Sequence, residues 1–133
     1  MLKRSFIICI VICCTAITTH AQTLKITDVT SSNDKMYKDV AANALGKNLV
    51  LTIYDKSVKV EPSGQKSIIL REQSEDYYYD ITEENGGERW TASLTVNKSL
   101  GVVTSAVLII TVSQTDKGIM NKSASCTITA KRF

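Results

Sequence analysis

From Lys47 to the end of the chain, apolar and polar side chains alternate with a period of two residues over one short segment after another. Successive side chains of a β-strand point to opposite faces, so this pattern predicts strands with one buried and one solvated face. The predicted inward residues of the clearest segment are Trp90, Ala92, Leu94 and Val96. The same pattern recurs at 49–54, 58–61, 77–82 and 124–131. Strands of this kind are typical of antiparallel sheets.

Turn-forming residues separate these segments at short intervals. They are Asp55-Lys56, Pro62-Ser63-Gly64, Asn85-Gly86-Gly87, Lys98-Ser99-Leu100-Gly101 and Asp116-Lys117-Gly118. Gly and Asn accept positive φ and Pro presets φ, which suits short connections between antiparallel strands. We therefore predict an all-β fold, an antiparallel up-and-down meander of about eight strands that closes into a small barrel. A β-sandwich is the alternative fold.

One segment departs from the alternation. Between Asn33 and Leu45, apolar residues recur at steps of three and four, which predicts one short amphipathic helix near the N-terminus. Ser32 is the predicted N-cap, and Gly46 is expected to end the helix. The helix follows a first strand at Leu24–Thr30, and its apolar stripe is expected to cover an open end or edge of the barrel.

The segment Val102–Val112 is apolar on both faces over its middle. One interpretation is a strand buried on both sides, with the helix or a second sheet over its outer face. The other is a strand of a transmembrane barrel, which needs lipid-facing apolar residues and aromatic girdles throughout. The outward positions of the other segments carry Thr, Ser, Lys and Asn, which favours the first interpretation.

The first 21 residues are typical of an export signal. Its parts are a basic start at Lys3 and Arg4, an apolar run at Phe6–Ile17, and the cleavage motif Thr19-His20-Ala21. The run is shorter than the roughly 20 apolar residues of a membrane span. We expect cleavage after Ala21, which would leave one domain at 22–133, no transmembrane segment, and a periplasmic or extracellular location.

Cleavage would exclude several kinds of catalytic and metal site from the 112 residues that remain. It removes the only histidine, His20, and three of the four cysteines, so that Cys126 is left, on the predicted inward face of its strand. Catalytic triads built on histidine and tetrahedral Cys/His zinc sites are then excluded. The remaining charge is 14 basic minus 13 acidic residues, or +1, without a basic patch, so nucleic acid is not an expected partner. A lipid anchor at Cys13 or Cys14 is the alternative to a soluble exported product.

The segment 72–90 is the most unusual of the chain, because it holds seven of the 13 acidic residues, three consecutive tyrosines and the only tryptophan. The candidate ligand-binding residues are Tyr77, Tyr78, Tyr79 and Trp90. Aromatic faces stack on sugar rings, and nearby carboxylates accept hydrogen bonds from hydroxyl groups. The competing interpretation places Tyr77 and Tyr79 in the core and Tyr78 on the solvated face of an edge strand.

The acids of this segment admit two further interpretations. Oxygen ligands for calcium would come from Asp80, Glu83, Glu84, Asn85 and Glu88. A pair of facing carboxylates is the arrangement of a glycosidase. The segment lacks the EF-hand pattern, and acid pairs are common by chance. We therefore predict no metal site, no cofactor and no catalytic residue.

On these residues the chain resembles the small exported bacterial lipocalin-like (calycin-type) β-barrel proteins. The shared features are the early helix, the strand pair 49–55 and 57–61, the tyrosine strand, the Trp90 strand and the long segment 102–112. The resemblance implies a small barrel that carries a ligand. The chain lacks the G-x-W motif that opens lipocalins, since its only tryptophan is Trp90, and so no binding residue is transferred.

The sequence therefore predicts an exported, non-catalytic binding protein that holds an apolar or glycan-like ligand in or near a barrel mouth. Small residues at predicted inward positions suit an interior that is not completely filled; they are Ala92, Ala106, Ala124 and Ala130. The alternative is a protein-interaction or inhibitor module of the cell envelope, with a solid core and an exposed apolar patch.

Overall fold

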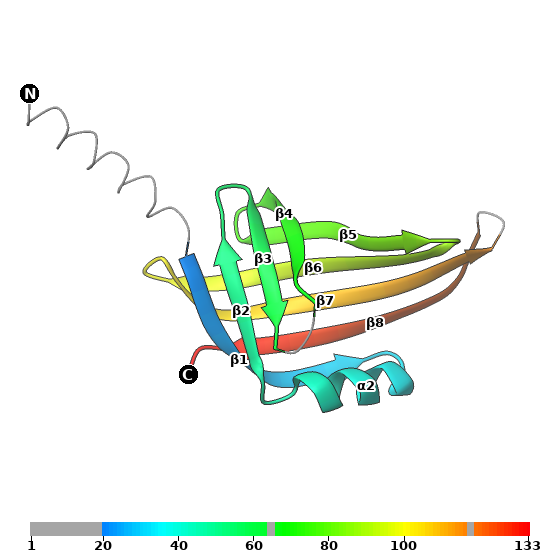
Figure 1. Cartoon of the computed structure of the whole chain (residues 1–133), viewed down its shortest axis with the longest axis horizontal. Helices are drawn as coiled ribbons and strands as arrows, with labels where there is room; N and C mark the ends of the chain where they lie inside the picture. Colours follow the sequence, from blue (N-terminus) through cyan, green and yellow to red (C-terminus); the bar gives the residue numbers. More distant parts are fainter. Residues whose placement is uncertain (1–19, 64–65, 117–118) are drawn as a thin grey trace, which may run out of the picture.

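A computed structural model of the chain describes residues 20–63, 66–116 and 119–133. Within these ranges the elements are β1 (His20–Ser31), α2 (Asp34–Ala44), β2 (Asn48–Ile53), β3 (Ser57–Pro62), β4 (Ile68–Ser74), β5 (Tyr77–Asn85), β6 (Glu88–Ser99), β7 (Val102–Asp116) and β8 (Ile119–Lys131). Each strand pairs antiparallel with the next, and β1 pairs with β8, so the sheet closes into a barrel (Figure 1). The predicted all-β meander barrel is thus confirmed, and the sandwich is not formed.

The predicted export signal lies outside the described residues as far as residue 19, and so do Cys13 and Cys14. His20 and Ala21 are the first residues of β1, and they pair with Ile53 and Thr52 of β2. No helix among the described residues is both long and apolar enough to cross a membrane.

The eight strands differ in length, and the barrel is therefore longer on one side. β6, β7 and β8 have 12, 15 and 13 residues, whereas β2 and β3 have six each. The pairing of β1 with β8 ends at Ser31 and Cys126. Along β5, the pairing with β4 ends at Tyr79. Beyond these points only β5 to β8 continue (Figure 1). We call this part, residues 81–91, 110–116 and 119–125, the distal sheet.

Inward side chains from all eight strands form one apolar cluster that fills the barrel. The alternation predicted for β6 is confirmed, since Ala92, Leu94 and Val96 are buried. Trp90 is only half-buried because it lies in the distal sheet, where no opposite strand covers it. Cys126 is buried on the inward face of β8, as predicted. The small inward residues are therefore matched by larger neighbours in a packed interior.

The inward and outward side chains of β5 are exchanged relative to the interpretation that placed Tyr77 and Tyr79 in the core. Tyr78 is 4% exposed and lies opposite the inward residue Leu94, whereas Tyr77 and Tyr79 are each 37% exposed and Ile81 is 42% exposed. The phase of β5 is set by the preceding turn, where Asp76 has a φ of 61° and the register between β4 and β5 shifts. Three identical residues in a row carry no periodic signal, so the sequence could not show this phase.

Two other elements, α2 and β4, differ from the prediction made from the sequence. The N-cap of α2 is Asn33, whose Oδ1 accepts a hydrogen bond from the Met36 backbone N–H at 3.0 Å. Ser32, the predicted cap, instead binds Ser125 of β8 through its backbone N–H, at 3.0 Å from the carbonyl oxygen. Gly46 follows the helix with a φ of 79°, as predicted. β4 has no clear alternation in its sequence and was not predicted.

The helix also lies elsewhere than over the apolar segment of β7. Side chains of α2 pack against β1 and β8 and against the core, and they include Met36, Val40 and Ala41. On the outer face of β7, Ile109 is 37% exposed. The interpretation of Val102–Val112 as a strand buried on both sides, with the helix or a second sheet over its outer face, is therefore wrong.

Candidate functional site

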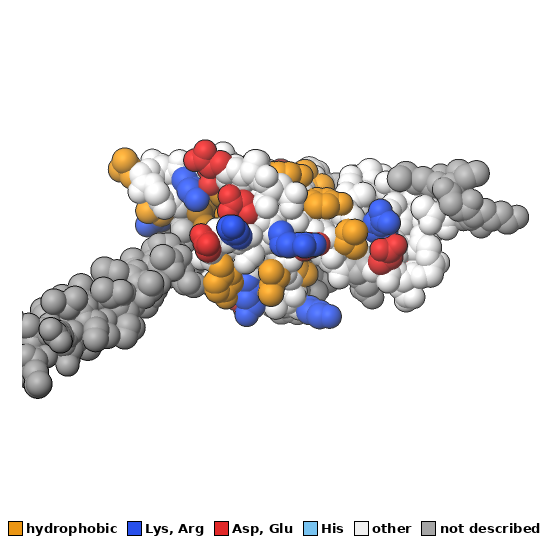
Figure 2. Space-filling view, turned by 90° about the horizontal axis from the view of Figure 1, so that it is seen from above, with side chains coloured by type: hydrophobic (Ala, Val, Ile, Leu, Met, Phe, Trp, Pro, Cys, Tyr) orange, Lys and Arg blue, Asp and Glu red, His pale blue; other side chains and the backbone are white. Residues whose placement is uncertain are grey.

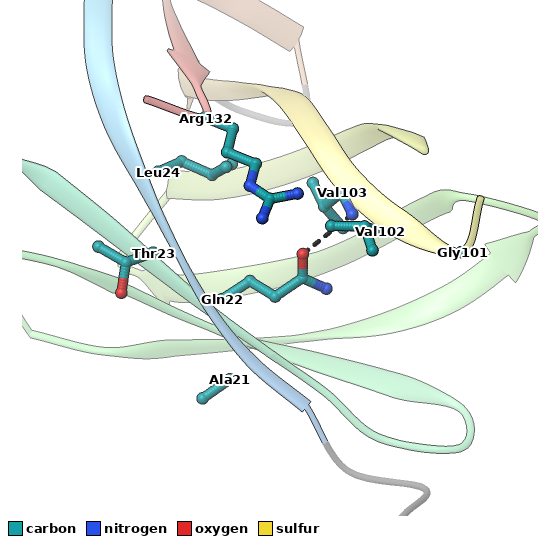
Figure 3. A pocket seen from close by; sticks show the side chains of 8 residues that line it. All are labelled: Ala21, Gln22, Thr23, Leu24, Gly101, Val102, Val103 and Arg132. Atoms are coloured by element: carbon teal, nitrogen blue, oxygen red, sulfur yellow. Dashed lines mark hydrogen bonds between the residues drawn. The ribbon is translucent and has the colours of Figure 1, made fainter. Parts of the chain in front are cut away.

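The strand β8 ends before its neighbours, and this leaves a gap at one end of the barrel. Its last residue, Lys131, lies opposite Lys25 of β1 and Ser105 of β7. Both neighbours extend further, to His20 and Val102, with no strand between them. The gap is an open hollow of about 420 Å³, which we call the mouth pocket (Figure 3). Its lining residues are Ala21, Gln22, Thr23, Leu24, Gly101, Val102, Val103 and Arg132.

Two hydrogen bonds take the place of the missing strand. The Val103 backbone N–H donates to Oε1 of Gln22 at 2.9 Å, across the gap from β7 to β1 (Figure 3). The Arg132 backbone N–H donates to the Thr104 carbonyl oxygen at 2.9 Å, one step past the end of β8. Because the Val103 side chain is fully buried, its N–H would otherwise be an unsatisfied donor. Both walls of the pocket are therefore fixed.

The pocket combines a small apolar surface with hydrogen-bond donors. Leu24 and Val103 lie at its base and are fully buried, so the accessible apolar side chain is that of Val102, which is 36% exposed. The Gln22 amide oxygen is already used, so its nitrogen presents two N–H groups at the side away from that bond. The guanidinium of Arg132 reaches over the pocket (Figure 3), and it makes no ion pair within the part of the chain that the structure describes. A ligand with hydrogen-bond acceptors and a small apolar part fits this arrangement.

The four aromatic residues predicted as a binding platform are not brought together. Tyr77 and Tyr79 lie on the outer face of β5, Tyr78 is in the core, and Trp90 is on the inner face of the distal sheet. The Trp90 indole N–H donates to Oε1 of Glu88 at 2.6 Å. This bond and a second one from the Gln114 amide lower the pKa of Glu88. None of these aromatic residues lines the mouth pocket.

Three of the seven acids of the segment 72–90 form ion pairs with basic side chains. The three ion pairs are Arg71–Asp80 at 2.9 Å, Arg89–Glu84 at 3.4 Å and Lys98–Asp76 at 2.9 Å. Hydrogen bonds from the Arg71 side chain and the Ile81 backbone lower the pKa of Asp80. Figure 2 shows one face of the molecule, on which basic and acidic side chains lie next to one another.

The residues that a calcium site would need are not brought together in the described structure. Within the described residues no three acidic, cysteine or histidine side chains are placed to hold a metal ion. The Glu83 side chain, one of the residues considered, lies outside the described part of the structure. Asp80 and Glu84 form ion pairs, and Glu88 accepts hydrogen bonds from Trp90 and Gln114.

A second hollow of about 490 Å³ lies on the inner face of the distal sheet. It is lined by Asn33, Val112, Gln114, Lys122, Ser123 and Ala124. Although it is slightly larger than the mouth pocket, its apolar residues are only half-buried. In the mouth pocket the Gln22 amide is held in place by its hydrogen bond from Val103, and so we take the mouth pocket as the candidate site.

Cys126 is poorly suited to nucleophilic chemistry. Its side chain is buried, and burial raises the pKa of the thiol, so the reactive thiolate is disfavoured. We expect iodoacetamide to label Cys126 at least about tenfold more slowly in the folded protein than in denaturant. Peptide-level mass spectrometry separates this residue from the other cysteines. Equal labelling rates in the two states would contradict the buried position.

Sequence analysis did not identify the residues of the mouth pocket. Gln22 and Arg132 are 110 positions apart, and each is a single polar residue at the end of a strand. The only signal available was the position of Gln22 next to the predicted cleavage site. Comparison with protein-family models, curated proteins and solved structures gave no match to this chain.

Proposed function

We propose that the protein is an exported, non-catalytic binding protein that holds a small ligand in the mouth pocket. The observation that carries this proposal is the gap beyond Lys131, where the amide of Gln22 and the guanidinium of Arg132 lie beside the exposed side chain of Val102. Because side chains fill the barrel interior, the ligand would sit at the mouth and not inside the barrel. The exposed side chain of Val102 suits an apolar group, and the N–H donors suit the oxygen atoms of a glycan-like or other polar ligand.

The side chains of the pocket favour binding over catalysis. Gln22 contributes an amide and Arg132 a guanidinium, and neither group is a usual general acid or base. The thiol of Cys126 is buried elsewhere in the core. Export to the periplasm or the extracellular space is supported by the basic start and apolar run of the first 21 residues, and a lipid anchor at Cys13 or Cys14 is the alternative.

An NMR titration tests the proposed site. The Val103 backbone amide and the Gln22 side-chain amide report directly on the pocket, because they form its bridging hydrogen bond. We expect at least one compound in a panel of small acids, amides, alcohols and sugars to shift these signals in a saturable manner. Signals of Val112 and Ala124, in the distal hollow, serve as the control and should not move. A panel without effect on the pocket signals would reject the proposal.

A protein-interaction module is the second candidate function, and one observation favours it. The outer faces of β5 and β7 expose Tyr77, Tyr79, Ile81 and Ile109, while the core beneath them is filled. Exposed apolar residues on a solid core are typical of surfaces that bind other proteins. If the ligand panel leaves the pocket signals unchanged, this candidate replaces the first.

A further inference from the structure

We propose that the outer face of β5 to β8 binds a neutral glycan chain, with sugar rings stacked on Tyr77 and Tyr79 and sugar hydroxyls bonded to the rows of Ser and Thr beside them. This face lies on the side of the sheet away from the core and does not include the mouth pocket, so the inference goes beyond the proposed function. It is carried by the charge of the face, by its hydroxyl groups and by its size.

Four neighbouring strands present an uninterrupted array of outward side chains. Figure 1 shows β5 to β8 side by side, and rows run straight across them, as in Tyr79, Ser93, Ile109 and Thr127. The array is every second residue of the ranges 77–81, 91–95, 107–111 and 125–129, three from each of four strands or twelve in all. The register shifts between these strands all lie outside it. We call these twelve residues the outer platform.

No residue of the outer platform is charged. A solvated surface of this size would ordinarily hold about three or four charged residues. The outward positions of the adjoining strands do hold them, namely Lys59 and Glu61 on β3 and Arg71 on β4. An anionic or cationic partner would find no opposite charge on the platform, whereas a neutral partner would not have to remove water from an ion.

Nine of the twelve residues carry a hydroxyl group, and the other three are Ile81, Val107 and Ile109. Within the part of the chain that the structure describes, none of these nine hydroxyls forms a hydrogen bond with another protein group. Elsewhere on the barrel, hydroxyls that donate to a backbone carbonyl oxygen are those of Thr27, Ser31, Thr82, Thr104 and Thr115. A free hydroxyl can both donate and accept, as the hydroxyls of a sugar also do.

Two tyrosines lie along one side of the outer platform. Tyr77 and Tyr79 are each 37% exposed, and because they are two positions apart on one strand, their Cα atoms are about 7 Å apart. Their partners on β6 are the small residues Thr95 and Ser93, so neither ring is packed under a larger neighbour on that strand. Exposed aromatic rings next to free hydroxyls suit the apolar faces and polar edges of successive sugar rings.

The size of the outer platform favours a glycan over a second protein. Strands about 4.8 Å apart and rows about 7 Å apart give it an area of roughly 400 Å². A standard protein interface buries about 800 Å² on each partner, so a second copy of this chain would need surface well beyond the platform. A single glycan chain is narrow enough to be held within it.

An NMR titration of the full chain with cellohexaose, chitohexaose and mannohexaose tests the inference. We expect at least one of them to shift the backbone amides of Ser93 and Ile109, at the centre of the platform, in a saturable manner. Added sodium chloride should not weaken this binding, because no ion pair contributes to it. The amides of Val103 and Gln22 in the mouth pocket should not shift in parallel.

Matched variants test the stacking. Tyr79→Ala should weaken binding about tenfold, the effect of one lost aromatic contact. Tyr54→Ala is the control, because Tyr54 is 40% exposed but lies between β2 and β3, away from the platform. Ser93→Lys should abolish binding, since it places a charge at the centre of the platform. Because Ser93 faces outward, the amide spectrum should show that this variant is folded.

The outcomes separate this inference from the proposed function. Shifts confined to Val103 and Gln22 would place the sugar in the mouth pocket, which would overturn the outer platform and support the proposed function. If none of the three oligosaccharides shifts the platform amides, the platform does not bind neutral glycans and the inference fails, whatever the mouth pocket binds. Equal affinities of Tyr79→Ala and Tyr54→Ala would also overturn it, because binding would then not involve stacking on this strand.

Discussion

Replacing Leu108 by alanine should lower the free energy of unfolding by about 3 kcal/mol, the centre of the range for large-to-small substitutions in a packed core. Leu108 is fully buried near the middle of β7, between Leu94 of β6 and Ile128 of β8. Loss of its side chain would leave a cavity that the neighbouring strands, held by backbone hydrogen bonds on both sides, cannot close. Chemical denaturation followed by circular dichroism measures the effect.

The matched control for this prediction is the next residue on the same strand. Ile109 faces outward and is 37% exposed, so Ile109→Ala should cost less than about 1 kcal/mol. The two substitutions remove similar apolar volume and differ mainly in the face of β7 that they change. Equal losses of stability would mean that both faces of β7 are buried, which would contradict the single-layer barrel.

The alternation that singles out Leu108 also explains how much of the fold was predictable. One buried and one solvated face give a period of two, and β6 and β8 follow it closely because each packs on one core. The pattern gives no prediction where an adjacent turn and the strand register determine which side chains face the core. The tyrosines of β5 have no polar partner residues between them, so the turn at Asp76 and the register shift next to it fix which tyrosine enters the core.

The candidate site could not be predicted because it results from a difference in strand length. The mouth pocket exists because β8 stops at Lys131 while β1 and β7 continue. Neither Gln22 nor Arg132 belongs to a motif, and they are brought together only by closure of the barrel between its first and last strands. The tyrosine and acid cluster attracted attention because its residues are adjacent in sequence, but in the sheet they separate onto opposite faces.

The second large effect is expected at the hairpin between β5 and β6, at the end of the distal sheet. Gly87 has a φ of 91°, and a Cβ atom built on it would lie 2.7 Å from the Thr115 carbonyl oxygen of β7. That oxygen is backbone and cannot move alone, because the Thr115 N–H also donates to the Gly87 carbonyl at 2.7 Å. Gly87→Ala therefore combines a strained φ with a steric clash, and it should destabilise the protein by about 3 kcal/mol.

Gly86 is the matched control, because it isolates the clash from the strain. Its φ is also positive, at 53°, but a Cβ atom there would meet nothing within 4 Å. Gly86→Ala should therefore cost only about 1 kcal/mol, the usual penalty of a left-handed conformation. Denaturation measures the global effect, and hydrogen exchange of the Thr115 amide shows whether the distal sheet opens locally. If Gly87→Ala costs no more than Gly86→Ala, and Thr115 exchanges no faster, then the hairpin does not pack against β7 at this distance.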